Sequence, residues 1–216
     1  MYNPFEWSYH STKIHFLPQK LMLLPEHKTL VIADWHLGKI EHFRKNGAFL
    51  PQVTSQKEYR LIQEIINQFN LKRIILLGDL FHSELNTDWF DFVEFLQINY
   101  QIEFILTKGN HDILPKAFYH LENLFVVKFY QIEDLIFTHE KSKIEPHQLN
   151  IIGHHHPGIA IKGRARQSYR LPCFYLENNI LIMPAFGEMT GLYIYEKTNQ
   201  NYIFPILGQE IIEYNP

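Results

Sequence analysis

Short apolar runs alternate with helix-patterned stretches through the first half of this chain. The apolar runs cover residues 30–33, 74–77 and 103–107, and each has the length of a buried strand. Residues 52–69 and 88–100 lie between them and repeat apolar side chains every three or four positions, which is one face of a helix. This β-α-β-α-β order predicts a parallel sheet with right-handed crossovers.

After about residue 123 the pattern changes to shorter β-prone segments separated by turn residues such as Asn178, Asn179, Gly187 and Gly191. The segments are 124–129, 135–138, 149–152, 158–162, 169–176, 180–183, 192–195 and 202–206. We therefore expect a second, mostly antiparallel sheet, packed on the first as a sandwich with helices outside. No repeat or linker interrupts the chain, so residues 1–216 are expected to form a single domain.

Composition excludes several classes of protein. Apolar residues make up 46 % of the 216 residues, which is too many for a disordered chain. The single cysteine, Cys173, excludes an internal disulfide and fits a reducing compartment. The start has no signal-peptide pattern, and no apolar run is long enough to span a membrane. We therefore expect a cytoplasmic protein without a membrane partner.

Histidine is the unusual component, because the chain has 13 of these residues and histidine is the commonest metal ligand. Acidic, amide and imidazole side chains directly follow five of the predicted strands. They are Asp34, His36, Asp79, Asn110, His111, Asp112, His139, His154, His155 and His156. The carboxyl ends of strands in an open α/β sheet are where ligands bind. We therefore expect these side chains to meet at one edge.

The spacing of these residues predicts how they could hold cations. Asp34 and His36 are two residues apart, as are His154 and His156, and an extended chain points such pairs to the same side. Each pair could then grip one ion from two directions. The carboxylate of Asp79, alone in its segment, could bridge two cations with its two oxygens.

This donor set is typical of a two-metal site. One ion would take Asp34, His36 and His156, and the other Asn110, His139 and His154. Mixed nitrogen and oxygen ligands favour Mn, Fe, Zn, Co or Ni over Ca or Mg alone. Two such ions about 3.5–4 Å apart are the centre of many phosphate-ester hydrolases. Two divalent ions would more than neutralise the formal charge of −3, so that charge does not exclude an anionic substrate.

Five motifs, in order, resemble those of calcineurin-like metallophosphoesterases. They are Asp34-Trp35-His36, Gly78-Asp79, Gly109-Asn110-His111-Asp112, His139 and Gly153-His154-His155-His156. Residues 33–39, 77–83, 171–174 and 184–187 look more narrowly like the bacterial ligase-associated DNA damage response metallophosphoesterases, an endonuclease family. Those proteins usually have Leu at the position of Trp35 and Glu-Pro after the fourth-motif histidine, where this chain has Glu140-Lys141.

The resemblance implies a four-layer αββα sandwich, an α/β (α+β) fold of two mixed β-sheets flanked by helices. It gives metal-ligand roles to seven residues: Asp34, His36, Asp79, Asn110, His139, His154 and His156. His111 becomes a catalytic acid that is not a ligand, and Asp112 fixes its tautomer. The implied cofactor is a pair of divalent ions, Mn²⁺ first. The implied context is DNA repair, with single-stranded or damaged DNA and partners of the ligase, helicase or exonuclease type.

Other residues near the motifs keep two interpretations. Lys39 and Arg44 could pair with a substrate phosphate or be solvated. His155 is open between substrate contact and packing. His82 could reach the cleft or cap the next helix. A basic stretch, which either follows a nucleic-acid backbone or is a solvated hairpin, consists of Lys162, Arg164, Arg166 and Arg170 with Tyr169. A set of alternating aromatic residues, which either cover a sheet edge or form a homo-oligomer contact, consists of Tyr2, Phe5, Trp7 and Tyr9.

We expect a dinuclear metal-dependent enzyme that hydrolyses phosphodiester, and also monoester, bonds. The absence of a G-x-S-x-G elbow and of a glycine-rich phosphate loop excludes serine-hydrolase and P-loop chemistry. Two alternatives remain: a nucleotide or lipid-linked pyrophosphatase or phosphatase of the same superfamily, and a metal-binding scaffold without turnover. His111 favours an enzyme, because a scaffold has no need of an acid that is not a ligand.

Overall fold

The computed structural model describes residues 3–39, 54–81, 85–163, 167–188 and 190–215. Five residues considered above lie outside the described ranges: Tyr2, Arg44, His82, Arg164 and Arg166.

The first sheet has seven strands in sequence order: β1 (Phe5–Tyr9), β2 (Thr12–Leu17), β3 (Leu21–Leu24), β4 (Thr29–Ala33), β5 (Arg73–Leu77), β6 (Glu103–Thr107) and β7 (Leu124–Val127). Strands β4 to β7 are parallel, as the alternation of apolar runs and helices predicts. Strands β1 to β4 form an antiparallel meander. β2 and β3 were not predicted from the sequence; β3 is wholly buried, and β2 alternates buried residues with Lys13 and His15.

The second sheet runs in the order β14-β11-β12-β13-β10-β9-β8. Its strands are β8 (Tyr130–Ile132), β9 (Leu135–Phe137), β10 (Leu149–Ile152), β11 (Pro157–Lys162), β12 (Ser168–Glu177), β13 (Ile180–Ile182) and β14 (Tyr193–Ile194), joined by β15 (Asn201–Leu207) and β16 (Glu210–Ile211). β10 lies between β9 and β13 and is parallel to both. β12 pairs antiparallel with β11, β13 and β15, so this sheet is mixed.

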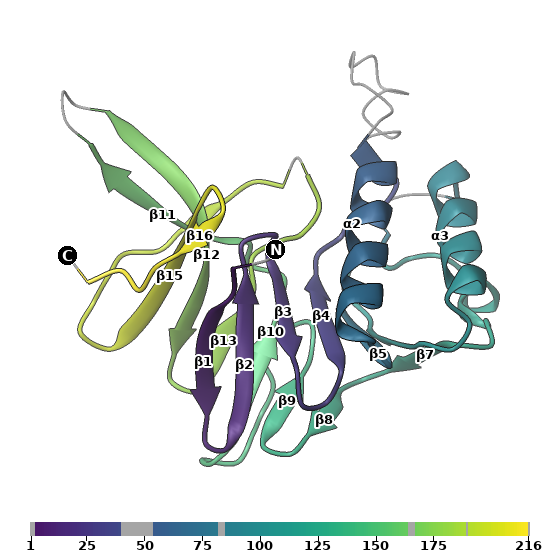
Figure 1. Cartoon of the computed structure of the whole chain (residues 1–216), viewed down its shortest axis with the longest axis horizontal. Helices are drawn as coiled ribbons and strands as arrows, with labels where there is room; N and C mark the ends of the chain where they lie inside the picture. The colour runs from purple at the N-terminus through teal and green to yellow at the C-terminus, as the bar shows by residue number, and fades with distance from the viewer. Residues whose placement is uncertain (1–2, 40–53, 82–84, 164–166, 189, 216) are drawn as a thin grey trace.

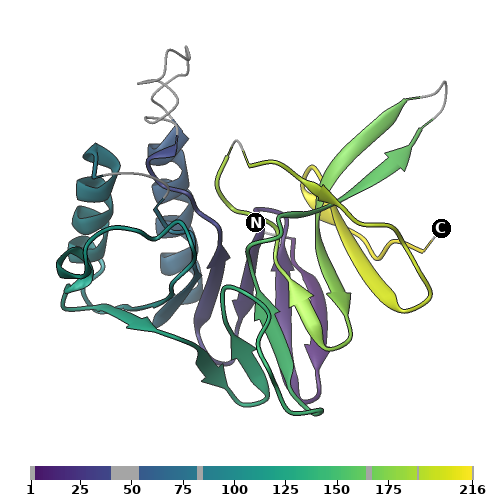
Figure 2. The same cartoon turned by 180° about the vertical axis from the view of Figure 1, so that it is seen from behind.

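The helices α2 (Thr54–Phe69) and α3 (Thr87–Ile98) lie side by side on the first sheet, and η1 (Lys116–Tyr119) is a short 3-10 turn. Figures 1 and 2 show both α-helices on the side away from the second sheet. Asn86 caps α3, because its side chain accepts a hydrogen bond from the amide of Asp88 at 3.0 Å. Ile62 and Ile65 of α2 and Phe92 of α3 are fully buried against strands β4 to β6.

The two-sheet α/β sandwich is therefore confirmed, with its helical layer on the first sheet. Among the described residues no helix covers the outer face of the second sheet. That face instead packs against chain segments around Tyr195 and Tyr214. The two sheets differ in this way because the strands of the second sheet are joined, within the described ranges, by turns and irregular segments and not by α-helices.

The main core lies between the sheets, where Phe16 of β2 stacks on Phe174 of β12 with ring centroids 4.3 Å apart. Phe5 and Trp7 of the edge strand β1 pack against this core; a role in a homo-oligomer stays a prediction. None of the helices in the described ranges is both long and apolar enough to cross a bilayer.

Candidate metal centre

Six of the seven proposed ligands lie in the turns that follow strands β4, β5, β9 and β10, and the seventh, Asn110, follows β6. Left-handed backbone conformations recur in these turns, with φ of 50° at Asp34, 46° at Asp79 and 69° at His154. His36 and His156 also have positive φ, at 53° and 48°. Such a conformation costs an L-residue roughly 1–2 kcal/mol, and residues held there cluster at functional sites. Strain at five of the seven proposed ligands therefore marks this edge.

The extended-chain argument for the spacing was wrong, because the strands end before the ligands begin. β4 ends at Ala33, and left-handed turns at Asp34 and His36 bring their side chains together. The same kind of turn at His154 and His156 sends these two histidines to different groups. This division agrees with the two ligand sets assigned from the sequence, but not with the expectation that His154 and His156 together hold one ion.

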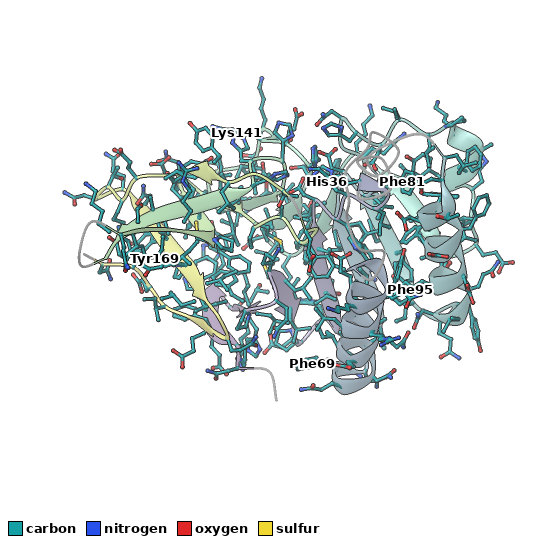
Figure 3. The ribbon with its side chains drawn as sticks, turned by 90° about the horizontal axis from the view of Figure 1, so that it is seen from above. His36, Phe69, Phe81, Phe95, Lys141 and Tyr169 are labelled. Carbon is teal, nitrogen blue, oxygen red and sulfur yellow. The ribbon has the colours of Figure 1, made fainter. Side chains whose placement is uncertain are left out.

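The first group consists of Asp34, His36 and His156. The Nε2 atoms of the two histidines are 3.3 Å apart, and Nε2 of His156 lies 3.6 Å from Oδ1 of Asp34. Asp34 is fully buried, and both its oxygens accept from the backbone amide of His154, at 3.0 and 2.9 Å. Viewed from above, His36 lies in the middle of the molecule, between the helical side and the second sheet (Figure 3).

The second group consists of Asp79, His139 and His154. Nε2 of His139 lies 3.1 Å from Nδ1 of His154 and 3.6 Å from Oδ1 of Asp79. The opposite ring nitrogen, Nδ1 of His139, is 2.8 Å from the carbonyl oxygen of Leu77 and donates to it. That bond leaves the Nε2 lone pair directed into the group, as in histidines that bind metals. The two groups adjoin, since the His139 ring also lies 3.9 Å from Oδ1 of Asp34.

Both groups fit a divalent cation. In each of them one carboxylate oxygen and two imidazole nitrogens lie within 4.8 Å of one another. Imidazole nitrogens that face each other can be satisfied by a shared proton or by a cation among them, and deprotonated N and O donors are what transition metals require. Asp34, His36, His139 and Asp79 are nearly or fully buried, which fixes their positions.

Close packing of backbone around Asp79 holds the second group. A Cβ at Gly109 would collide with Oδ1 of Asp79 and come within 2.8 Å of Nε2 of His139. Gly78 has a φ of +67°, and a Cβ there would meet the His139 ring. Glycine is therefore required at both positions. The same Asp79 oxygen accepts from the backbone amide of His111 at 2.9 Å.

The structure places the proposed acid, His111, beside the first group. Its ring lies edge-on to that of His36, with centroids 5.6 Å apart and an interplanar angle of 71°. His111 is half-buried. Asn110 is exposed, between Gly109 and His111, at the mouth of the site. Its role as a ligand or substrate contact stays a prediction.

Asp112 stabilises the loop after β6 through hydrogen bonds. Its carboxylate oxygens accept from the backbone amides of Gly109 at 2.8 Å and Phe81 at 3.1 Å. Burial raises the pKa of this carboxyl, and the two amides act in the opposite direction. These contacts tie the loop after β6 to the loop after β5. Control of the His111 tautomer by Asp112 stays a prediction.

Two of the predicted substrate contacts lie next to the groups. His155 is exposed and its Nδ1 is 3.1 Å from the hydroxyl of Tyr195; burial lowers its pKa. Lys39 is half-buried and lines a small pocket with His36. Burial lowers the pKa of Lys39, while Asp79 and Asp34 raise it. Lys162 and Arg170 lie on the β11–β12 hairpin, which extends away from the helices (Figure 1).

Sequence reasoning missed Glu58, which lies behind the first group. The indole N–H of Trp35 donates to its carboxylate at 2.7 Å, and a backbone amide of Glu188 donates to it as well. Burial raises the pKa of Glu58 to about 7. No sequence signal identifies this residue, because its contacts depend on how α2 packs against the first sheet.

Asn150 was missed as well. Its side chain is fully buried and donates to the carbonyl of Ile136 and to the hydroxyl of Thr138, the residue before His139. Its amide oxygen accepts from the backbone N–H of Ser142 at 2.8 Å. Asn150 thus holds the segment that carries His139.

Comparisons with known proteins agree with this geometry. The family model for calcineurin-like phosphoesterases matches residues 27–178. Among solved structures, the nuclease MPE of Pseudomonas putida superposes with a TM-score of 0.79 at 20 % sequence identity, covering 98 % of this chain and 100 % of the nuclease. Comparison with curated protein sequences finds no match. The family match covers more than half of the chain and contains every proposed ligand, and we conclude that the chain belongs to the calcineurin-like phosphoesterase family.

Proposed function

We propose that this metal-dependent phosphoesterase is a phosphodiesterase that cleaves nucleic acid at a centre of two divalent ions, Mn²⁺ first among them. The observation that carries the proposal is the pair of adjoining donor groups, Asp34–His36–His156 and Asp79–His139–His154. Asp79 would bridge the two ions and Asn110 would complete the second. The solved structure of similar fold is described as a nuclease, which supports a nucleic acid as the substrate; DNA and a DNA-repair context are proposed from the resemblance of the motifs.

The carboxylates and histidines of the two groups would hold the metal ions next to the open edge of the sheet. Two divalent ions, when bound, lower the pKa of water and neutralise charge on phosphoryl oxygens. The remaining chemistry belongs to the chain. His111, beside His36, would donate its ring proton to the leaving oxygen. Asp79 anchors the amide of His111 and so keeps that ring next to the ligands. Lys39 and His155 would contact the substrate.

Further properties belong to the same proposal. We infer that residues 1–216 form a single domain and that the protein acts in the cytoplasm, in line with the single buried Cys173. Coverage of 98 % of this chain by one solved nuclease supports the single domain. Partners of the ligase, helicase or exonuclease type, and a homo-oligomer, remain predictions.

Metal titration with parallel activity assays tests the proposal. The metal-depleted protein should bind two Mn²⁺ per chain by calorimetry and then hydrolyse bis-p-nitrophenyl phosphate faster than the p-nitrophenyl monoester. Single-stranded DNA and cyclic nucleotides should be assayed beside them. Cleavage of a nucleotide pyrophosphate alone would favour the pyrophosphatase alternative. Fewer than two metals per chain and no diester cleavage would refute the proposal.

Asp79→Asn should abolish hydrolysis, because it removes the negative charge proposed to bridge the two ions. The matched control is Asp134→Asn, since Asp134 is a surface carboxylate paired with His10. Full activity in Asp79→Asn would overturn the ligand assignment.

A further inference from the structure

A row of rings leads from the second donor group to the surface. The ring of His139 lies 4.9 Å from that of His154, which lies 5.5 Å from that of His155. The ring centroids of His155 and Tyr193 are in turn 6.4 Å apart, with the two planes at 88° in an edge-to-face arrangement. Tyr193 is 61 % exposed. The row therefore begins at a proposed ligand and ends at an open aromatic face.

The last two rings are held in place. The backbone amide of Tyr193 donates to the carbonyl of the proposed ligand His156 at 3.0 Å, and Tyr193 pairs with Pro157 in the parallel ladder of β14 and β11. The Tyr193 ring lies 4.9 Å from that of Tyr195, whose hydroxyl is hydrogen-bonded to His155. Tyr193 is therefore a rigid, exposed ring at a fixed distance from the donor groups.

We propose that Tyr193, with the edge of His155, is a stacking subsite for one nucleobase of single-stranded nucleic acid. This inference rests on the proposed function and names the part of the substrate that the metal centre does not contact. A planar base has a π-face that stacks on an exposed aromatic ring regardless of sequence. A nucleotide whose phosphate lies at the donor groups carries a neighbouring base toward Tyr193. Bases inside a duplex are already stacked and cannot use the subsite.

Binding and cleavage of oligonucleotides test the subsite. Tyr193→Ala should lower kcat/KM on a single-stranded oligodeoxynucleotide by about 5- to 150-fold, the loss expected when one stacked base is released. Tyr193→Phe should stay within about twofold of the parent protein, because the ring remains. An oligonucleotide of the same length with abasic residues should be cleaved equally by the parent and by Tyr193→Ala.

The matched control is Tyr100→Ala. Tyr100 is 68 % exposed but lies before the start of β6, at the end of that strand opposite the donor groups. This variant should cleave both oligonucleotides like the parent protein. Equal losses on the normal and the abasic oligonucleotide in Tyr193→Ala would overturn the subsite, as would no loss on either.

A binding measurement separates failure of the subsite from failure of the proposed function. Fluorescence of a 2-aminopurine oligonucleotide should be quenched by the parent protein and by Tyr193→Phe, and not by Tyr193→Ala, whether or not cleavage occurs. If no diester is cleaved, the proposed function fails, but the quenching still shows whether a base stacks on Tyr193. Equal quenching by Tyr193→Ala, or a dependence on Tyr193 that is as large for duplex DNA, would overturn it.

Discussion

The indole N–H of Trp35 donates to the carboxylate of Glu58 across 2.7 Å, and this bond joins the turn between two proposed ligands to helix α2. Trp35 stands between Asp34 and His36 and is 2 % exposed. Its ring packs edge-on against Phe186 at 5.5 Å. Backbone amides of Phe186 and Gly187 donate to the carbonyls of Ala33 and Asp34. The first motif is therefore clamped from two sides by parts of the chain distant in sequence.

Breaking this clamp should weaken metal binding without removing a ligand. We expect Trp35→Phe and Glu58→Gln each to bind Mn²⁺ more weakly by calorimetry. The double variant should lose less binding free energy for Mn²⁺ than the sum of the two single losses, with a coupling free energy of about 0.5–3 kcal/mol, because the two residues share one hydrogen bond. Trp7→Phe, in the edge strand β1, is the matched control. Additive losses would show that the two residues act independently.

The raised pKa of Glu58 predicts how stability depends on pH. Burial is the main cause of its pKa of about 7; the hydrogen bonds from Trp35 and from the Glu188 amide lower it, the Glu188 charge raises it, and the Lys20 charge lowers it. The native carboxyl holds its proton above pH 4.5, the ordinary value at which the unfolded chain releases it. The stability that it contributes is therefore present below about pH 4.5 and is lost as pH rises through about 7.

Denaturant titrations between pH 4.5 and 8 should follow this loss, which amounts to roughly 3 kcal/mol or less. Glu58→Gln should flatten this part of the pH profile, because glutamine does not titrate. The same slope in the variant as in the parent protein would show that other groups cause it.

Gly109→Ala should disable the second donor group. The added Cβ would collide with the Asp79 carboxylate and press on the His139 ring, so we expect loss of one bound Mn²⁺ and of most diester hydrolysis. Gly191→Ala is the matched control, because a Cβ at Gly191 meets nothing within 4 Å. Calorimetry and activity should both separate the two variants. Two tightly bound ions in Gly109→Ala would contradict the packing argument.

Asn150→Ala should destabilise the protein and loosen His139. Both ends of this buried amide are hydrogen-bonded, and its loss leaves the Ile136 carbonyl and the Ser142 amide without that partner. The expected loss in free energy of unfolding is about 1–3 kcal/mol, with weaker Mn²⁺ binding. The exposed Asn67 of α2 offers a control, and Asn67→Ala should leave both quantities unchanged. Normal metal affinity in Asn150→Ala would limit its role to stability.

Local pattern was sufficient for the parallel part of the first sheet and for the order of the motifs. The apolar runs at 74–77 and 103–107 end where β5 and β6 end, because a buried strand must be apolar throughout. The N-terminal strands β2 and β3 were not predicted. β3 pairs with β4 and β2 pairs with β3 in the meander, so both strands enter the sheet through contacts with neighbouring strands and not through a connecting helix.

The sequence by itself determined which residue types arrive at the strand ends, because the motif residues follow apolar runs whose burial fixes their positions. Only the tertiary structure decided how these side chains are brought together. His154 and His156 fall in different groups, as in the ligand sets assigned from the sequence, but the left-handed turns that separate them were not predicted. Glu58 reaches Trp35 only through the packing of α2. Tyr193 comes beside His155 only through the pairing of β14 with β11. Such contacts join segments far apart in the chain, and short-range spacing carries no information about them.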